Sequence, residues 1–166
     1  MPSKKEADAV LDKIFALLKK RLRADPYAMD GLYACEIRKL PVGLRAMAAT
    51  HWLDLSLCMD SVDWHFGNFG EDGLVRETEA GLRELGLTEL ADVFRSTHVI
   101  VKPYIAKARK SDMSVDELAQ RDGHEDQLRQ LRRKAWDLGK RGAESAIYSA
   151  WVQYAKAHPD KVFVHE

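Results

Sequence analysis

The chain has 166 residues, of which 46% are hydrophobic and 31% are charged, with 26 basic and 26 acidic side chains. This composition is typical of one folded globular domain and excludes a disordered chain. The resulting net charge of zero argues against a dedicated nucleic-acid binder, which is normally basic, and equally against a strongly acidic protein that imitates nucleic acid.

The first residues predict a helix over 3–24. Ser3 and Glu6 have the spacing of a capping box, and apolar residues then recur every three or four positions as far as Arg23. Asp25-Pro26 ends the pattern, because the residue before proline avoids the helical region. Acidic residues interrupt the apolar stretch, and no run approaches the roughly 18 residues of a membrane span. We therefore expect a cytoplasmic protein without a targeting signal or membrane segment.

A central helix is expected over 42–62, after a short helix within 27–41 that ends at Pro41. The segment 42–62 is apolar on several sides, which is typical of a helix buried in the middle of a bundle. Cys35 and Cys58 have apolar neighbours and form no CxxC pair, so we expect two reduced and buried thiols.

Further helices are expected over 74–86, 88–110, 114–122, 128–139 and 147–158, with a kink or break at Pro103. No stretch alternates with the period of a strand. The predicted fold is all-α, one domain over 1–166, and a bundle of about seven helices without a sheet. The helix at 3–24 is expected to pack on a core formed by 42–158.

The stretch DSVDWHFGNFGEDG, residues 60–73, carries the groups that chemistry would need. A carboxylate, an imidazole and an amide held close together serve in acid–base catalysis or ligand binding. One hypothesis is therefore an enzyme or small-ligand binder with its pocket here. The candidate pocket residues are Asp63, Trp64, His65, Phe66 and Asn68.

The favoured interpretation of the same stretch is a corner between two helices. Gly67, Gly70 and Gly73 supply backbone freedom for a turn, and Asp72 is a suitable cap for the next helix. The aromatic side chains then fold inward and the carboxylates stay in water. The chain contains no HExxH motif, paired Glu-x-x-His motif or phosphate-binding glycine loop, so we predict no metal site, no cofactor and no catalytic residues.

Charge is distributed unevenly along the chain. Residues 60–92 contain nine acidic residues and two arginines, whereas 129–141 contains six basic residues and one aspartate. The first block predicts an acidic surface for a basic partner, with Glu71, Asp72, Glu77, Glu79 and Glu84 as its binding residues. The second block is a candidate surface for nucleic acid, which the zero net charge disfavours. A simpler alternative is two solvated helix faces that pair with each other.

Residues in the acidic block and near the end of the chain resemble a known family. Val62, Trp64, Phe66, Asn68 and Gly70 are similar to the motif of a bacterial family of all-helical domains of unknown function. Its named member is a DNA-mimic protein that blocks a transcriptional regulator. The resemblance extends over 40–163. Other matching positions are Glu77, Gly81, Leu82, Leu85, Gly86, Ala91, Trp151 to Tyr154, His158 to Asp160, and Phe163.

This resemblance implies a helical fold and a structural role for Asn68. Two departures prevent DNA mimicry from being carried over with it. Val62-Asp63 stands where the family usually has a glycine pair, and this chain is neutral where a mimic needs dense surface acid.

The leading hypothesis is a non-enzymatic cytoplasmic protein that binds another, basic protein through residues 60–92, in a regulatory role. A second copy of the chain is a further candidate partner. Neither a membrane nor nucleic acid is expected as a partner. The alternative is the pocket at 60–73.

Overall fold

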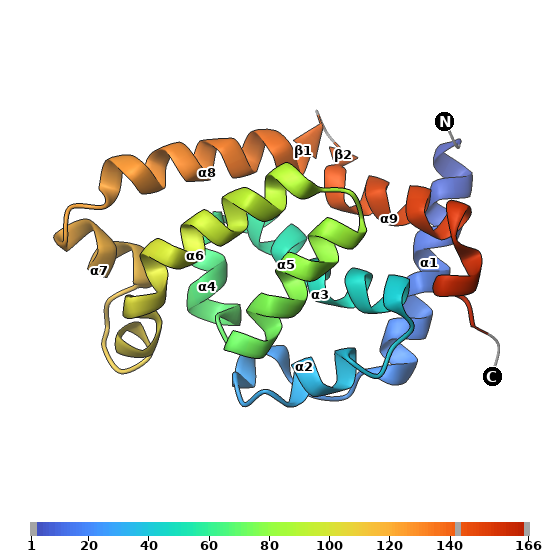
Figure 1. Ribbon diagram of the computed structural model, residues 1–166, viewed down its shortest axis with the longest axis horizontal. Coiled ribbons are helices and arrows are strands. Elements are labelled where there is room, and N and C mark those ends of the chain that lie inside the picture. Colours follow the sequence, from blue (N-terminus) through green and yellow to red (C-terminus); the bar gives the residue numbers. More distant parts are fainter. Residues whose placement is uncertain (1–2, 142–143, 165–166) are drawn as a thin grey trace.

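The structure is a computed structural model that describes residues 3–141 and 144–164, and helices dominate it (Figure 1). The expected all-helical fold is confirmed, although these ranges contain nine α-helices where about seven were predicted. The helices are α1 (Lys4–Arg21), α2 (Leu32–Ile37), α3 (Val42–Met59), α4 (Val62–Phe69), α5 (Asp72–Glu84), α6 (Thr88–Ala108), α7 (Val115–Arg121), α8 (Glu125–Gly139) and α9 (Ala146–Ala157). Two 3-10 turns, η1 (Pro26–Ala28) and η2 (Pro159–Lys161), lie beside them.

A short antiparallel strand pair lies between α8 and α9. Strand β1 (Lys140–Arg141) pairs with β2 (Glu144–Ser145), and Lys140 lies opposite Ser145. The sequence analysis predicted no strand here, because two-residue strands carry no alternating pattern. This hairpin links two helices and does not change the helical architecture.

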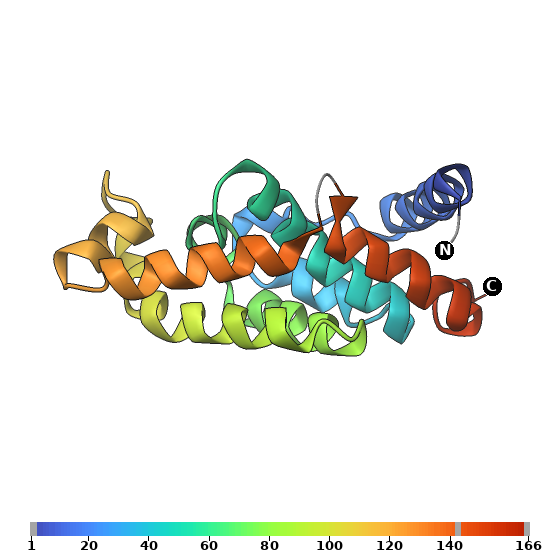
Figure 2. The ribbon, with the colours of Figure 1, turned by 90° about the horizontal axis from the view of Figure 1, so that it is seen from above.

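Helix α3 lies at the centre of the molecule. It contacts α1, α2, α4, α5, α8 and α9, and Figure 2 shows α1 and α6 on different sides of it. Its side chains Leu44, Met47, Leu53 and Leu57 are buried, as the apolar pattern around this helix predicted. The neighbouring α5 approaches α3 closely at Gly81, where an added Cβ would lie 2.9 Å from the Ala46 carbonyl oxygen.

Helix α1 packs against α9 and α3, so the two ends of the described chain lie on the same side of the molecule (Figure 1). Ile14 and Leu18 are its buried residues. The capping box of Ser3 and Glu6 is present, and Ser114 and Glu117 form a second one at the start of α7. These helix starts could be predicted because both partners of each cap lie within four residues.

Of the kink or break expected at Pro103, the break is wrong, since α6 continues through this residue. Proline removes the backbone donor to the carbonyl of Val99, four residues earlier. Both Pro103 and Val99 are exposed, so water can solvate that carbonyl.

The expectation of two buried thiols is also wrong, because Cys35 and Cys58 are both free and exposed. Tyr33, Ala34 and Ile37 are the buried residues of α2, and Cys35 lies on the other side of that helix. The apolar residues near Cys35 in the sequence therefore lie on the buried face of the helix, and the thiol lies on the exposed face.

Candidate functional site

The 60–73 segment forms a helix of its own, α4, where a glycine-rich corner was expected. The Ser61 hydroxyl caps it by accepting from the Trp64 amide at 3.3 Å. Among the described residues, the glycines with positive φ are Gly31, Gly86 and Gly123, so Gly67 and Gly70 are not needed for an unusual backbone conformation. A Cβ on Gly70 would lie 2.2 Å from the Phe66 carbonyl oxygen. Gly70 is therefore explained by the lack of room for a Cβ, and not by the geometry of a turn.

Asp63 does not stay in water as the corner interpretation expected. Its side chain is 1% exposed and accepts three hydrogen bonds from Arg132 of α8, two from Nε at 2.9 and 3.0 Å and one from Nη2 at 2.6 Å. Asp63 raises the pKa of the Arg132 guanidinium through these bonds. The acidic and basic segments therefore pair with each other at this point.

His65 is fully buried in the core. The Ser56 hydroxyl donates to the Trp52 carbonyl at 2.7 Å, so we assign the 2.9 Å contact between Ser56 and His65 as a bond from Nδ1–H to the hydroxyl oxygen. Among the residues that the structure describes, none forms a hydrogen bond with Nε2. Burial lowers the pKa of His65 to about 3, and the ring packs 5.2 to 5.6 Å from Phe66, Phe69 and Phe94.

The other candidate pocket residues of α4 also have structural contacts. Phe66 is buried, Trp64 is partly buried, and the Asn68 amide donates to the Trp64 carbonyl at 3.1 Å. Neither these three nor Asp63 and His65 line the grooves and cavities described below. The five residues proposed from the sequence therefore lie close together in the chain without sharing an accessible pocket.

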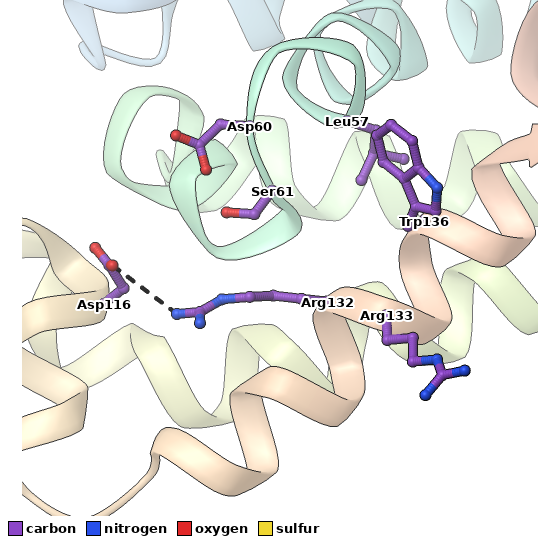
Figure 3. Close-up of a pocket in the computed structure, with 7 residues that line it drawn as sticks. All are labelled: Leu57, Asp60, Ser61, Asp116, Arg132, Arg133 and Trp136. Carbon is purple, nitrogen blue, oxygen red and sulfur yellow. Dashed lines mark ion pairs between the residues drawn. The ribbon is translucent and has the colours of Figure 1, made fainter.

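A groove of about 430 Å³ lies beside α4, between the α3–α4 junction and α8. Figure 3 shows Arg132 extended across it towards Asp116, 3.9 Å away, and Arg133 pointing away from that pair. Trp136 stands beside Leu57 and is 47% exposed. The groove is lined by Leu57, Asp60, Ser61, Asp116, Arg132, Arg133 and Trp136.

This groove suits binding better than catalysis, because the Arg132 guanidinium is already engaged by Asp63. Sequence reasoning did not identify Asp116 or Trp136 as site residues. No local signal marks them, since they lie more than 50 residues from Asp60 in the chain and the fold alone brings them together.

The carboxylates of the predicted acidic surface have different environments. Glu71 caps α5 by accepting from the amides of Gly73 and Leu74 at 2.7 and 2.8 Å. The prediction that Asp72 is this cap is wrong, because Asp72 is the first residue of the helix and is exposed. Its carboxylate lies 3.9 Å from the Lys102 ammonium.

Glu77 faces the interior of the molecule. It is 6% exposed and accepts from Arg38 at 2.9 Å and from Arg45 at 2.6 and 2.8 Å. Burial alone would raise the pKa of Glu77, but the hydrogen bonds from Arg45 and Arg38 outweigh it and lower the pKa. This carboxylate joins α5 to α2 and α3 and is not available to a partner.

The carboxylates near the α5–α6 junction point outward. Glu79 pairs with Arg83 at 3.0 Å and with Arg95 at 3.3 Å. Glu84 is exposed and accepts from the Tyr154 hydroxyl, whose pKa is raised by burial and by this carboxylate. Glu89 is exposed in the first turn of α6.

A polar cluster between α3 and α9 was not predicted. The buried Asp54 accepts from the Ser145 hydroxyl, and burial raises the pKa of its carboxyl group. The His51 ring nitrogen Nδ1 lies 2.9 Å from the Tyr148 hydroxyl. His51 and Asp54 share a helix face, but their partners come from residues about a hundred positions later, so the sequence gives no signal for the pairing.

Within the described ranges, no group of three or more histidine, cysteine and acidic side chains is arranged to hold a metal ion. No helix in these ranges has the length and apolar character needed to cross a bilayer.

Comparison with known proteins supports the resemblance noted from the residues. No curated protein and no solved structure gives a significant match. A family model described as "DMP19-like protein" matches residues 38–158, which run from the end of α2 to the end of α9. Because this match covers most of the chain, the protein belongs to the DMP19-like family.

Proposed function

We propose that this protein acts by binding a basic surface of another protein through the carboxylates at the α5–α6 junction. The observation that carries the proposal is the exposure of the Glu84 and Glu89 carboxylates without a neighbouring cation. Both are exposed, and neither forms an ion pair with the cations in the described ranges. Uncompensated charges of one sign attract a complementary surface and raise its rate of association.

The remaining carboxylates of the predicted surface support this location for the interface. Glu77 is buried between two arginines, and Glu79 is shared by Arg83 and Arg95. Binding a partner through either would require an existing ion pair to be broken. The carboxylates at the junction can be desolvated by a partner without that loss.

Family membership favours protein binding, because the named member of this family is a DNA mimic. Such a mimic needs a dense array of unpaired carboxylates in place of phosphates. Here Arg38, Arg45, Arg83 and Arg95 neutralise the middle of the acidic block. We therefore propose binding to a basic protein surface without imitation of the DNA backbone.

The groove of Figure 3 is the second candidate site, and it replaces the pocket first expected at 60–73. Its lining includes the half-exposed Trp136 and Arg133, and tryptophan and arginine are both enriched at protein interfaces. A partner could use this groove in place of the carboxylates.

Affinity capture from the cells of origin tests both sites with one set of variants. The double variant Glu84→Gln/Glu89→Gln removes the two junction charges, and Asp8→Asn/Asp12→Asn removes two exposed charges from α1 as a matched control. Trp136→Ala tests the groove. We expect the same partner with the wild type, the α1 control and Trp136→Ala, and a loss of several-fold with the junction variant.

Retention of the partner by the junction variant, or its loss from the α1 control as well, would contradict the proposal. Loss confined to Trp136→Ala would move the interface to the groove. Light scattering on the purified chain shows whether the partner is a second copy. Far-UV circular dichroism of each variant confirms that the helices are intact.

A further inference from the structure

An apolar surface cavity of about 360 Å³, open to solvent, lies between the C-terminal half of α1, the segment leading to α2, and α3. In Figure 1, α1 lies at the right-hand side of the molecule, α2 at the bottom and α3 in the middle. Three aromatic side chains, Phe15, Tyr33 and Trp52, form much of its wall. This volume lies within the range of roughly 300 to 1,000 Å³ found for small-molecule sites.

The aromatic wall is held in place by contacts among its own members. The Trp52 indole N–H donates to the Tyr33 hydroxyl at 2.9 Å, which links the polar ends of the two rings. The His51 ring lies 4.8 Å from Trp52 and 5.5 Å from Phe15, in edge-to-face geometry in both cases. The rings are therefore fixed before any ligand enters, which lowers the entropic cost of binding.

Two polar side chains reach this otherwise apolar cavity. Lys19 is exposed at its edge and forms no ion pair with the described acidic residues. His51 uses Nδ1 for its contact with Tyr148, while Nε2 makes no hydrogen bond in the described ranges and is not buried. Burial lowers the pKa of His51, so at neutral pH this ring is uncharged and the lysine is the cation.

We propose that this cavity binds a small planar aromatic carboxylate, with its ring against Phe15 and Trp52 and its carboxylate near Lys19. The flat apolar wall selects a ring, and the single unpaired ammonium group at the edge selects a negative charge. An aromatic cation would be repelled by Lys19, and a neutral ring would leave that ammonium without a partner.

The site is independent of the protein interface proposed above. Of its nine lining residues, His51 and Trp52 lie within the range 38–158 that matches the family model, and the other seven precede it. The cavity therefore belongs mainly to the N-terminal part of this chain, and membership of the family does not imply it.

The test is a titration of the full chain with 2-naphthoate, followed by two-dimensional NMR of the indole N–H groups. The chain has four tryptophans, and the Trp52→Phe variant identifies the Trp52 signal. We expect saturable movement of this signal, because its N–H bonds to Tyr33 at the cavity wall. The signal of Trp136, in the groove of Figure 3, should not move.

Matched ligands and variants test the charge and the cavity separately. Lys19→Gln should weaken naphthoate binding by about threefold, the effect of losing one exposed ion pair, and leave neutral 2-naphthylmethanol unaffected. Lys5→Gln, on the same helix and away from the cavity, should change neither ligand. Ala24→Leu should abolish binding of both ligands by filling the cavity, while the other indole signals report an intact fold.

Three results would overturn the proposal. One is naphthoate binding that Ala24→Leu leaves unchanged. Another is equal binding by wild type and Lys19→Gln. The third is movement of other indole signals without that of Trp52. None of these results bears on the α5–α6 interface.

Discussion

Asp63 and His65 lie two residues apart on α4, and burial affects them differently. Asp63 has a cationic partner, since Arg132 supplies three hydrogen bonds to the carboxylate. His65 has no cationic or anionic partner in its aromatic surroundings, so it stays neutral. Both side chains are therefore enclosed where α4 packs against its neighbours and are not free for chemistry.

The Asp63–Arg132 pair should respond unequally to loss of each partner. Arg132→Met leaves a carboxylate that is 1% exposed without its cation, and we expect a loss of about 3 kcal/mol in unfolding free energy. Asp63→Asn leaves a guanidinium that is 25% exposed and lies 3.6 Å from Glu125, and we expect a loss of about 1 kcal/mol.

Urea denaturation of the two single variants and the double variant measures these losses. The double variant should lose less unfolding free energy than the two single variants lose together, because the carboxylate and its cation are then both absent. An equal or larger loss for Asp63→Asn than for Arg132→Met would contradict this account of the pair.

His65 should make folding stability depend on pH. The pKa of His65 is about 3 in the folded protein and about 6.5 in the unfolded chain, so below pH 6.5 the unfolded state binds the additional proton. Stability should therefore fall as the pH is lowered, by about 2 kcal/mol between pH 7 and pH 5 from this residue alone.

Denaturation of His65→Leu at the two pH values checks this contribution. The variant should lose about 2 kcal/mol less than the wild type on acidification, whereas His158→Asn, at an exposed position, should behave like the wild type. The same pH dependence in His65→Leu and wild type would show that His65 is not a buried neutral group.

At the scale of elements, close approach explains two glycines, one of which, Gly70, the sequence had suggested was a turn residue. Gly70 lies against the Phe66 carbonyl, and Gly81 brings α5 onto the backbone of α3. Gly86, in contrast, has φ of +77° after the end of α5, as its position in the sequence predicted. A glycine in a sequence can therefore indicate either a positive φ or a position where a Cβ would not fit, and the two are distinguished only in the folded structure.

A matched pair of glycine substitutions separates these cases. Gly81→Ala places a Cβ 2.9 Å from the Ala46 carbonyl oxygen, a backbone atom that cannot move aside, and should cost about 2 kcal/mol. Gly67→Ala meets its nearest neighbour, Val115, at an ordinary 3.6 Å within a helix and should be neutral or stabilising. Thermal unfolding measures both. A Gly81→Ala variant as stable as Gly67→Ala would contradict close packing of α5 on α3.

Over the whole molecule, local patterns predicted the helices and long-range contacts decided the site. The caps at Ser3 and Ser114 each involve residues three positions apart, which is why the cap at Ser3 and a helix start at 114 could be predicted. The pairing of Glu77 with Arg38 and Arg45 joins residues more than 30 positions apart, and no sequence pattern marks it. The sequence therefore suggested that all carboxylates of the acidic block are equally exposed, whereas in the structure some of them are paired with arginines.

Whether a carboxylate is paired with an arginine decides whether it can contact a partner protein. Pairing with arginine removes Glu77 and Asp63 from the surface charge, and Glu79 is partly compensated. Of the exposed carboxylates in this block that form no ion pair with the described cations, Glu84 and Glu89 lie at the junction of α5 and α6, and Asp60 lies in the groove beside α4. The central claim is that the two junction carboxylates form the contact with a basic partner.

Zero-length carbodiimide cross-linking of the captured complex, followed by mass spectrometry, tests that claim most directly. It joins a carboxylate to a partner lysine in direct contact. The account predicts cross-links from Glu84 or Glu89 to lysines of the partner, which weaken as salt screens the interface. Cross-links confined to carboxylates elsewhere, such as Asp8 and Asp12 of α1 or Asp60 and Asp116 of the groove, would contradict it.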